Sequence, residues 1–404
     1  MPTRRRTLAT TAVLLAPLLV VPLTAPAASA DGSLASSIAV DWQRTAARTI
    51  YVERGSAPPL GSLYLAFTSL AVHDAALEAQ RHGANASAAA VATAAHDVLR
   101  EYFPLSGATL DADLAASLAK VPNGKKEATG IAIGAAAADE MIDSRVGDGR
   151  NDTSIVYTKT AALGIWPALP MLGGMALPWL GFVDPVVDVD PVALDGPDPY
   201  TSAAFATDYE EARTLGSVAG TSRTQAQTDV ATFFANNPML MYRNALCDYL
   251  GTEPLGLLPT TRLFARIDAA TATTFIATWR MKYEIGFWRP DQAVDAALTD
   301  GNPGTNPHPV DWVPLVPNPA YSDYTSGHGS ATSPFAEVLR RTLGDDTPLL
   351  LKAGALQRPY ATLTALEHDA LNARIWGGLH FRDSMEDTYY LGHTTADEVI
   401  SVVH

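Results

Sequence analysis

The 404-residue sequence has a single cysteine, Cys247, and relatively few basic residues. One cysteine excludes an internal disulfide, so the stability of the fold must come from a packed core. The 28 basic and 43 acidic residues give a formal net charge of −15. A surface this acidic repels nucleic acid and anionic lipid, so neither is expected as a partner. Any site for an anion must therefore be a local concentration of positive charge.

The alternation of β-branched and polar residues that is typical of strands is almost absent from the first part of the mature chain. Alanine-rich patterns recur there at helical spacing, and a second series of helical patterns begins near residue 224. These patterns predict helices over residues 40–51, 60–82, 88–102, 112–118, 127–147, 224–234, 239–250, 261–288, 335–343, 349–372 and 384–403. We therefore expect an all-α protein made of two helical lobes or bundles.

Two proline-rich stretches interrupt the helical patterns, at residues 148–200 and 301–319. Proline removes a backbone donor and ends helices, so both stretches are predicted to be extended connections. The first is long enough to be functional, and we expect it to form one wall of a pocket. The predicted organisation is an N-terminal lobe with this crossover at residues 31–215 and a C-terminal bundle at residues 216–404.

Residues 1–30 have the layout of an export signal. A basic start with three consecutive arginines precedes an apolar run, and the small residues Ala28, Ser29 and Ala30 form a cleavage pattern. The paired arginines suit the twin-arginine route, so we expect a secreted protein. The alternative, a membrane anchor, is disfavoured because the run is short and contains prolines. No later segment is expected to span a membrane, and the processed chain would carry about −18 charges from its 25 basic and 43 acidic residues.

Three short motifs in the second half bring together residues that suit an anion site. The first, KYEIGFWRP, places Lys282 and Arg289 seven residues apart, which on one continuous helix returns them to the same face. Pro290 is expected to end that helix just after Arg289. Two cations at this spacing fit either a solvated helix edge or a clamp for an anion.

The second motif lies in PAYSDYTSGHGSATSPFAEVL and contains Ser326, Gly327 and His328. A hydroxyl residue followed by glycine, just before a helical pattern, predicts a helix N-cap. The unpaired N–H groups and the dipole of such a helix end favour an anion. Capping alone leaves His328 unexplained, and Pro334 either kinks this helix or marks a later start.

The third motif, ARIWGGLHFRD, contains Arg374 and His380 on either side of a glycine pair. The forked guanidinium of Arg374 suits a phosphate-like oxyanion. Adjacent glycines disfavour a helix interior but permit a turn that would aim His380 at the same point. By itself the motif is also compatible with a plain loop between two helices.

In this order the three motifs resemble the signature shared by vanadium-dependent haloperoxidases and the phosphatidic-acid phosphatase superfamily. The resemblance extends over the mature chain, which is similar to bacterial secreted members on the haloperoxidase side. It implies that vanadate or phosphate is bound between helices. The residues that would neutralise or hydrogen-bond its oxygens are Lys282, Arg289, Arg374, Ser326 and Gly327. His380 would bond the vanadium, or attack phosphorus in a phosphatase, and His328 would be the acid/base.

The sequence departs from the family pattern at Ser384, where a carboxylate often orients the covalent histidine. Asp383 or Asp387 is expected to take that role, because a histidine ligand needs a partner that fixes its tautomer. The aromatic residues Trp288, Tyr321, Tyr324 and Trp376 are candidates for the halide pocket only because they are near the motifs in the sequence.

The resemblance implies a vanadate-dependent haloperoxidase that uses hydrogen peroxide and halide to make hypohalous acid, with or without an organic acceptor. Its alternative is an acid phosphatase with a phosphohistidine intermediate. A metallohydrolase would use ligands drawn from His308, His328, His368, His380 and Asp383, although the usual ligand spacings are missing. A non-catalytic binding protein would leave the three ordered motifs without a purpose. The sequence does not reveal the oligomeric state, and it leaves a homodimer open.

Overall fold

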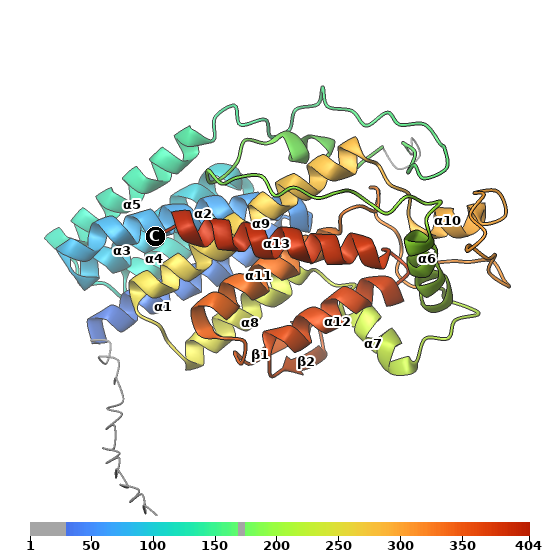
Figure 1. Cartoon of the computed structure of the whole chain (residues 1–404). Coiled ribbons are helices and arrows are strands. Elements are labelled where there is room, and N and C mark those ends of the chain that lie inside the picture. The colour runs from blue at the N-terminus through green and yellow to red at the C-terminus, as the bar shows by residue number, and fades with distance from the viewer. Residues whose placement is uncertain (1–29, 169–173) are drawn as a thin grey trace, which may run out of the picture.

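The computed structural model describes residues 30–168 and 174–404. Apart from its last residue, the predicted export signal lies outside the described residues. Apart from one β-hairpin, the regular structure of the described chain is helical (Figure 1). The predicted all-α class is therefore confirmed.

The N-terminal half is a layer of closely packed helices. The α3 and α5 backbones almost touch, because a Cβ added at Gly130 would lie 2.1 Å from the carbonyl oxygen of Ala86, and one at Gly134 would lie 2.4 Å from that of Ala90. The elements are α1 (Ala30–Ala47), the π-helix η1 (Arg48–Glu53), α2 (Pro58–Ala79), η2 (Gln80–His82), α3 (Ala84–Tyr102), η3 (Pro104–Ser106), α4 (Gly107–Leu118) and α5 (Lys125–Ser144). Small residues at these contacts let the helices approach this closely.

The stretch Pro58–His82 is long and apolar enough, by length and composition, to cross a membrane. This contradicts the expectation that no later segment would pass that test. However, 78% of the tested window is buried inside the protein. Such burial is typical of the core helix of a globular fold, and α2 packs against α3, α5 and α9.

The proline-rich crossover after α5 is extended, as predicted, and its one described helical turn is η5 (Pro178–Phe182). It lies against α9: a Cβ added at Gly181 would be 2.3 Å from the Arg280 nitrogen. The Trp166 N–H donates to the Gly286 carbonyl at 2.8 Å. Figure 1 shows this segment running along the outside of the bundle.

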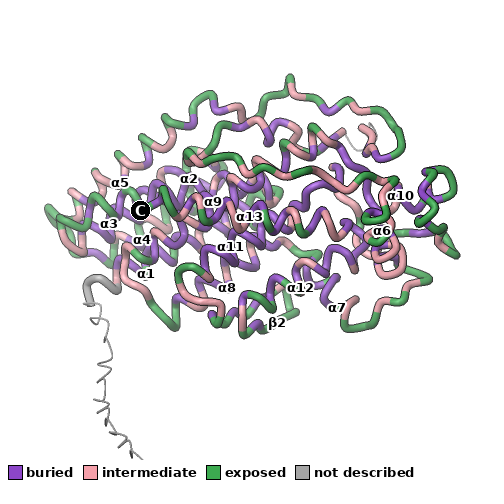
Figure 2. Tube along the Cα trace, viewed as in Figure 1, coloured by how far each residue is buried: buried purple, intermediate pink, exposed green. Residues whose placement is uncertain are grey.

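The C-terminal half is arranged around the long helix α9, which packs against α2, α11 and α13. Figure 2 shows the burial concentrated along these central helices. Contacts of α2 with α9 and of α1 with α8 join both halves in one core, and the division near residue 215 stays a prediction. The helices are α6 (Ala203–Leu215), α7 (Gln225–Phe233), α8 (Pro238–Thr252), α9 (Leu257–Glu284), α10 (Pro290–Ala296), α11 (Gly327–Leu343), α12 (Leu363–Trp376) and α13 (Arg382–Val402).

The helix predicted over residues 349–372 is wrong in its first half. Residues Leu349–Ala353 and Leu356–Tyr360 form the antiparallel strands β1 and β2. Gly354, with φ of +60°, makes the turn between them. Along β1 buried and exposed residues alternate with period two, a pattern too short to stand out in a leucine-rich run. Helix α12 begins only at Leu363.

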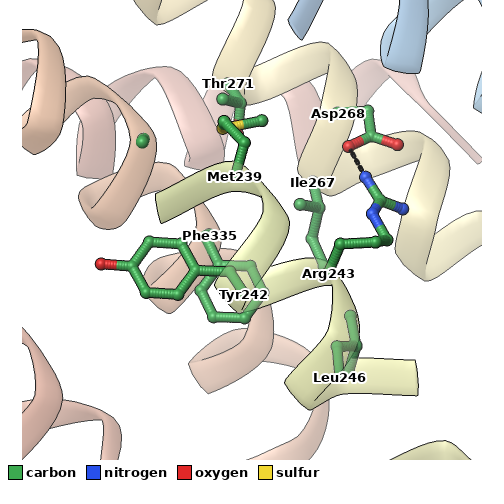
Figure 3. Close-up of a pocket in the computed structure, with 9 residues that line it drawn as sticks. Met239, Tyr242, Arg243, Leu246, Ile267, Asp268, Thr271 and Phe335 are labelled. Atoms are coloured by element: carbon green, nitrogen blue, oxygen red, sulfur yellow. Dashed lines mark hydrogen bonds and ion pairs between the residues drawn. The ribbon is translucent and has the colours of Figure 1, made fainter. Parts of the chain in front are cut away.

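A buried ion pair lies in the core between α8 and α9. The Arg243 guanidinium points at the Asp268 carboxylate, and the two side chains are 3% and 0% exposed (Figure 3). Arg243 also donates to the Gln43 side chain at 2.5 Å, and Ser69 donates to Asp268 at 2.5 Å. The adjoining cavity has a volume of about 10 Å³, enough for about one water molecule, so it is a packing defect rather than a substrate pocket.

Candidate active site

Three cations lie buried at the end of the bundle where α9 and α12 end and α11 and α13 begin, the end that carries α6 and α10 in Figure 1. Lys282 is in the last turn of α9, Arg374 is in the last turn of α12, and Arg289 immediately precedes α10. Their exposed fractions are 0%, 4% and 1% respectively. Cations in the last turn of a helix also face its negative dipole end, which favours their positions.

The three cations are held by backbone carbonyls. Lys282 Nζ donates to the carbonyls of Ser322 (2.7 Å) and Asp323 (2.8 Å). Arg289 donates to Ser322 as well (3.3 Å), and to Leu379 next to His380 (2.6 Å). Two cations thus share the Ser322 carbonyl.

No carboxylate oxygen lies within 4 Å of these three side-chain cations in the described chain. Burial lowers the pKa of Lys282 well below its usual value, and the neighbouring Arg289 adds to this shift. Burial likewise lowers the pKa of Arg374 to about 10. The Asp323 carboxylate acts on Lys282 and Arg289 from beyond that distance and offsets part of the cost of burying them. One carboxylate does not balance three cations, and a multiply charged anion between them would offset the remainder.

Lys282 and Arg289 do not lie on one helix, contrary to the expectation from their seven-residue spacing. Helix α9 ends at Glu284, and Gly286 adopts φ of +65°, so the chain turns before Arg289. Pro290 does not end the first helix but starts the next, where its missing N–H costs nothing. The turn brings both cations to the same carbonyl.

The predicted N-cap is confirmed at Ser326, whose hydroxyl accepts the Gly329 N–H at 3.3 Å. Helix α11 starts at Gly327 and continues through Pro334, so the proline marks no later start. The first N–H groups of a helix have no partner within it, so those at Gly327 and His328 are available to an anion. A Cβ at position 327 would meet the Trp279 ring at 3.4 Å, which leaves little room for a side chain there.

His328 lies on the first turn of α11, and its Nε2 atom is buried without a hydrogen-bond partner in the described structure. Burial lowers the pKa of His328 well below its usual value, and the positive charge of Arg374 lowers it further. Arg374 itself donates to the Phe234 carbonyl at 3.2 Å, while its Nε has no partner among the described residues. A neutral imidazole beside unpartnered donors can accept a proton from a bound reactant.

The glycine pair of the third motif makes the turn that aims His380. Helix α12 ends at Trp376, and Gly378 has φ of +75°. A Cβ there would lie 2.6 Å from the Gly216 carbonyl oxygen, so the position needs glycine for space and for conformation. His380 is 2% exposed, and burial together with Arg289 and Lys282 lowers its pKa well below its usual value.

The carboxylate beside His380 is Asp323, which the sequence interpretation missed. Its Oδ1 lies 2.7 Å from His380 Nδ1. The expectation for Asp383 and Asp387 is corrected: Asp383 accepts the Asp198 N–H at 3.1 Å, and Asp387 accepts the Tyr324 hydroxyl. Both residues follow His380 on α13 and face the crossover, whereas Asp323 precedes the serine–glycine–histidine motif. The only sequence signal for Asp323 was its position three residues before Ser326, within the stretch PAYSDYTSGHGSATSPFAEVL.

Of the aromatic candidates, Tyr321 is the one placed at the cations. Its ring centre lies 4.9 Å from Lys282 Nζ and 5.2 Å from the Arg289 guanidinium carbon. Trp279, not foreseen from the sequence, packs on Tyr321 with ring centres 5.0 Å apart. The other candidates lie elsewhere. Trp288 packs on Phe205 and Tyr200, Tyr324 bonds to Asp387, and Trp376 lines a surface depression with Arg358.

The described part of the chain does not assemble a metallohydrolase site. The described residues contain no group of three or more His, Cys, Asp or Glu side chains that could hold a metal ion. His308 is bonded to the Val310 carbonyl, and the side chain of His368 is 69% exposed beside Asp369. The donor set at the bundle end, with cations, helix N–H groups and neutral histidines, instead fits a tetrahedral oxyanion.

Comparisons with known proteins agree with this geometry. Residues 262–404 match the family model for the VCPO second helical-bundle domain. A vanadium chloroperoxidase of Curvularia inaequalis is 34% identical over 104 residues, which are 22% of this chain and 16% of that protein. The chain thus spans well under two thirds of that relative's length.

Solved structures extend the similarity to the whole fold. A bacterial vanadium-dependent iodoperoxidase has a TM-score of 0.72 at 18% identity, covering 91% of this chain and 97% of that one. An apo-type bacterial vanadium-dependent chloroperoxidase has a TM-score of 0.69 at 16% identity, covering 85% and 93%. The chain therefore has the helical-bundle fold of the vanadium haloperoxidases. The matches of the family model and of the curated relative are confined to part of the chain, and the family-model match lies in the C-terminal bundle.

Proposed function

We propose that this protein is a vanadate-dependent haloperoxidase that oxidises halide with hydrogen peroxide to hypohalous acid. The observation that carries the proposal is the group of three buried cations, Lys282, Arg289 and Arg374, with no carboxylate within 4 Å in the described chain and two histidines of lowered pKa nearby. Vanadate, when bound, supplies an electrophilic metal centre that activates hydrogen peroxide for attack by halide.

The side chains divide the work by position. Lys282, Arg289 and Arg374 would neutralise the anion's oxygens and would stay directed at charge that develops during the reaction. The Ser326 hydroxyl and the Gly327 N–H add hydrogen bonds from the α11 N-terminus. The cations keep their places before the anion arrives, because backbone carbonyls already hold them.

The two histidines have distinct roles. His380 would hold the vanadium through Nε2, because Nδ1 faces Asp323. His328, near Arg374, would take a proton from hydrogen peroxide and return one to the product. Tyr321 and Trp279 form the apolar wall from which halide or an organic acceptor would approach.

The test is halide oxidation by the purified chain without residues 1–30. Activity is assayed with hydrogen peroxide and iodide, bromide or chloride, before and after orthovanadate is added, and phosphate-ester hydrolysis is followed in the anion-free protein. Oxidation that depends on vanadate, and that falls at least a hundredfold in His380→Ala, is expected. Hydrolysis that vanadate inhibits, without any oxidation, would make the protein an acid phosphatase that uses a phosphohistidine at the same site.

Residues 1–30 are proposed to direct export, with Arg5 and Arg6 read by the twin-arginine route. The support is the order of basic, apolar and small residues in the sequence. Replacing both arginines by lysine should retain the protein inside the producing cell, as measured by fractionation. Unchanged export of the doubly substituted protein would contradict the twin-arginine route.

A further inference from the structure

We propose that Asp323 is the positioning residue for His380, in place of the carboxylate that the family pattern puts at position 384. The inference rests on the proposed function, since it concerns the histidine that would hold vanadium. It assigns no new chemical step. A carboxylate from the segment before α11 orients the His380 ring, whereas the family pattern places the orienting carboxylate on α13.

The first support is the pairing of the two side chains. Asp323 Oδ1 and His380 Nδ1 are 2.7 Å apart, and the residues are 0% and 2% exposed. Neither Asp323 carboxylate oxygen nor His380 Nδ1 meets hydrogen-bond geometry with any group of the described structure, so their 2.7 Å approach is a close polar contact between the two side chains. A buried carboxylate is costly, and the charges of Arg289 and Lys282 together with this contact account for its place.

The second support is the way the Asp323 backbone is held. Its N–H donates to the Phe287 carbonyl at 2.9 Å, and its carbonyl accepts from Lys282 Nζ at 2.8 Å. The segment that carries the carboxylate is therefore fixed to the end of α9. That end also carries Lys282, one of the cations that would bind vanadate. A displacement of Asp323 would thus be resisted by the same contacts that place Lys282.

The third support is Ser384, which occupies the position where the family pattern has a carboxylate. The Ser384 hydroxyl is 3.3 Å from the Asp323 carbonyl oxygen, and both residues line one cavity of about 10 Å³. Position 384 therefore lies next to Asp323, within reach of the same space. A carboxylate there would compete with Asp323, and the small serine leaves the space to it.

The chemical consequence is a fixed tautomer. A carboxylate accepts the Nδ1 proton of His380, which leaves the lone pair of Nε2 directed away from Asp323 for the metal. An amide at position 323 can present its NH₂ group to Nδ1 and so favour the opposite tautomer. An alanine would leave the ring without a partner.

The experiment combines ¹⁵N-histidine NMR of the anion-free protein with calorimetric titration of orthovanadate. In the wild type, His380 should carry its proton on Nδ1. In Asp323→Ala and in the near-isosteric Asp323→Asn, the Nε2-protonated form should appear and vanadate should bind about 10–100-fold more weakly. The double variant Asp323→Ala/Ser384→Asp should regain the Nδ1-protonated form and most of the affinity, because the carboxylate returns to the family position.

The matched control is Asp383→Asn, three residues from His380 but bonded to the Asp198 backbone. It should change neither readout. Nδ1 protonation and vanadate affinity that remain at wild-type values in Asp323→Ala and Asp323→Asn would overturn the proposal. The tautomer is measured without vanadate, so a protein that proves not to be a haloperoxidase would still report whether Asp323 orients His380.

Discussion

The core and the site end of the bundle both bury charge, but they satisfy it differently. In the core, Arg243 meets Asp268 and a glutamine side chain, so its charge is paired within the chain (Figure 3). At the site end, Lys282 and Arg374 donate to backbone carbonyls and have no carboxylate within 4 Å in the described chain. As whole residues, Arg243 and Arg374 are each 4% exposed, so burial alone does not distinguish them.

This difference separates a structural charge from a functional one. A buried ion that is already paired contributes to the fold, and removing one partner leaves the other stranded. A buried cation that lacks an anionic partner lowers the stability of the bare protein, and that cost is recovered only when an anion binds. The site end therefore stores part of the free energy of anion binding in its own desolvated cations.

The largest expected effect is on the core pair. Arg243→Met should lower the free energy of unfolding by about 3–5 kcal/mol, because Asp268 would remain buried without a counter-charge. Arg374→Met in the anion-free protein should cost no more than about 1 kcal/mol, since it leaves no buried carboxylate behind. Urea unfolding of both variants at pH 7 measures the contrast.

The control for this contrast is the double variant Arg243→Met/Asp268→Leu, which removes both charges and should recover most of the lost stability. An Arg374→Met variant that is as unstable as Arg243→Met would contradict the distinction between the two regions. It would mean that the charge of Arg374 is already compensated within the folded protein, without a bound anion.

The second effect, intermediate in size, is stabilisation by vanadate. At a free concentration one hundred times its Kd, vanadate should raise the free energy of unfolding of the wild type by about 2.7 kcal/mol. The same concentration should have a much smaller effect on Arg374→Met, whereas Arg243→Met should keep the full increment. Urea unfolding with and without vanadate tests this, and an equal increment in Arg374→Met would remove that residue from the site.

The sequence predicted the helices well wherever one face repeats over several turns. It also predicted the N-cap at Ser326 and the turn at the glycine pair, because those features depend on local chemistry. The β-hairpin was missed because its strands span only five residues each and lie in a leucine-rich run. A short apolar run does not distinguish a strand from a helix.

The errors at the site arose where position depends on tertiary packing. Lys282 and Arg289 meet through a turn at Gly286, not through a continuous helix. Asp323 and His380 are 57 positions apart in the sequence, so no local spacing could reveal their contact. Asp383 and Asp387, close to His380 in the sequence, lie on α13 with other partners.

The smallest effect concerns pH and compares His328 at the site with His73 in the core. Burial lowers the pKa of His328 well below 6.5, so on acidification the unfolded chain binds a proton that the folded protein refuses. Stability from this group is complete above pH 6.5 and falls below it, by about 1 kcal/mol between pH 6.5 and 5.5. In His328→Gln, urea unfolding of the anion-free protein should lose that much less stability over this interval.

His73→Gln is the matched core variant, and its effect on the pH dependence should be smaller. Burial also lowers the pKa of His73, but its bond to the His404 carbonyl opposes the shift, and the ring keeps hydrogen bonds to that carbonyl and to Thr261. An acid-induced loss that is the same in His328→Gln and in the wild type would show that His328 has the same pKa in the folded protein as in the unfolded chain. Burial would then not be what keeps this imidazole neutral, and its role as a base held neutral by the site would lose its support.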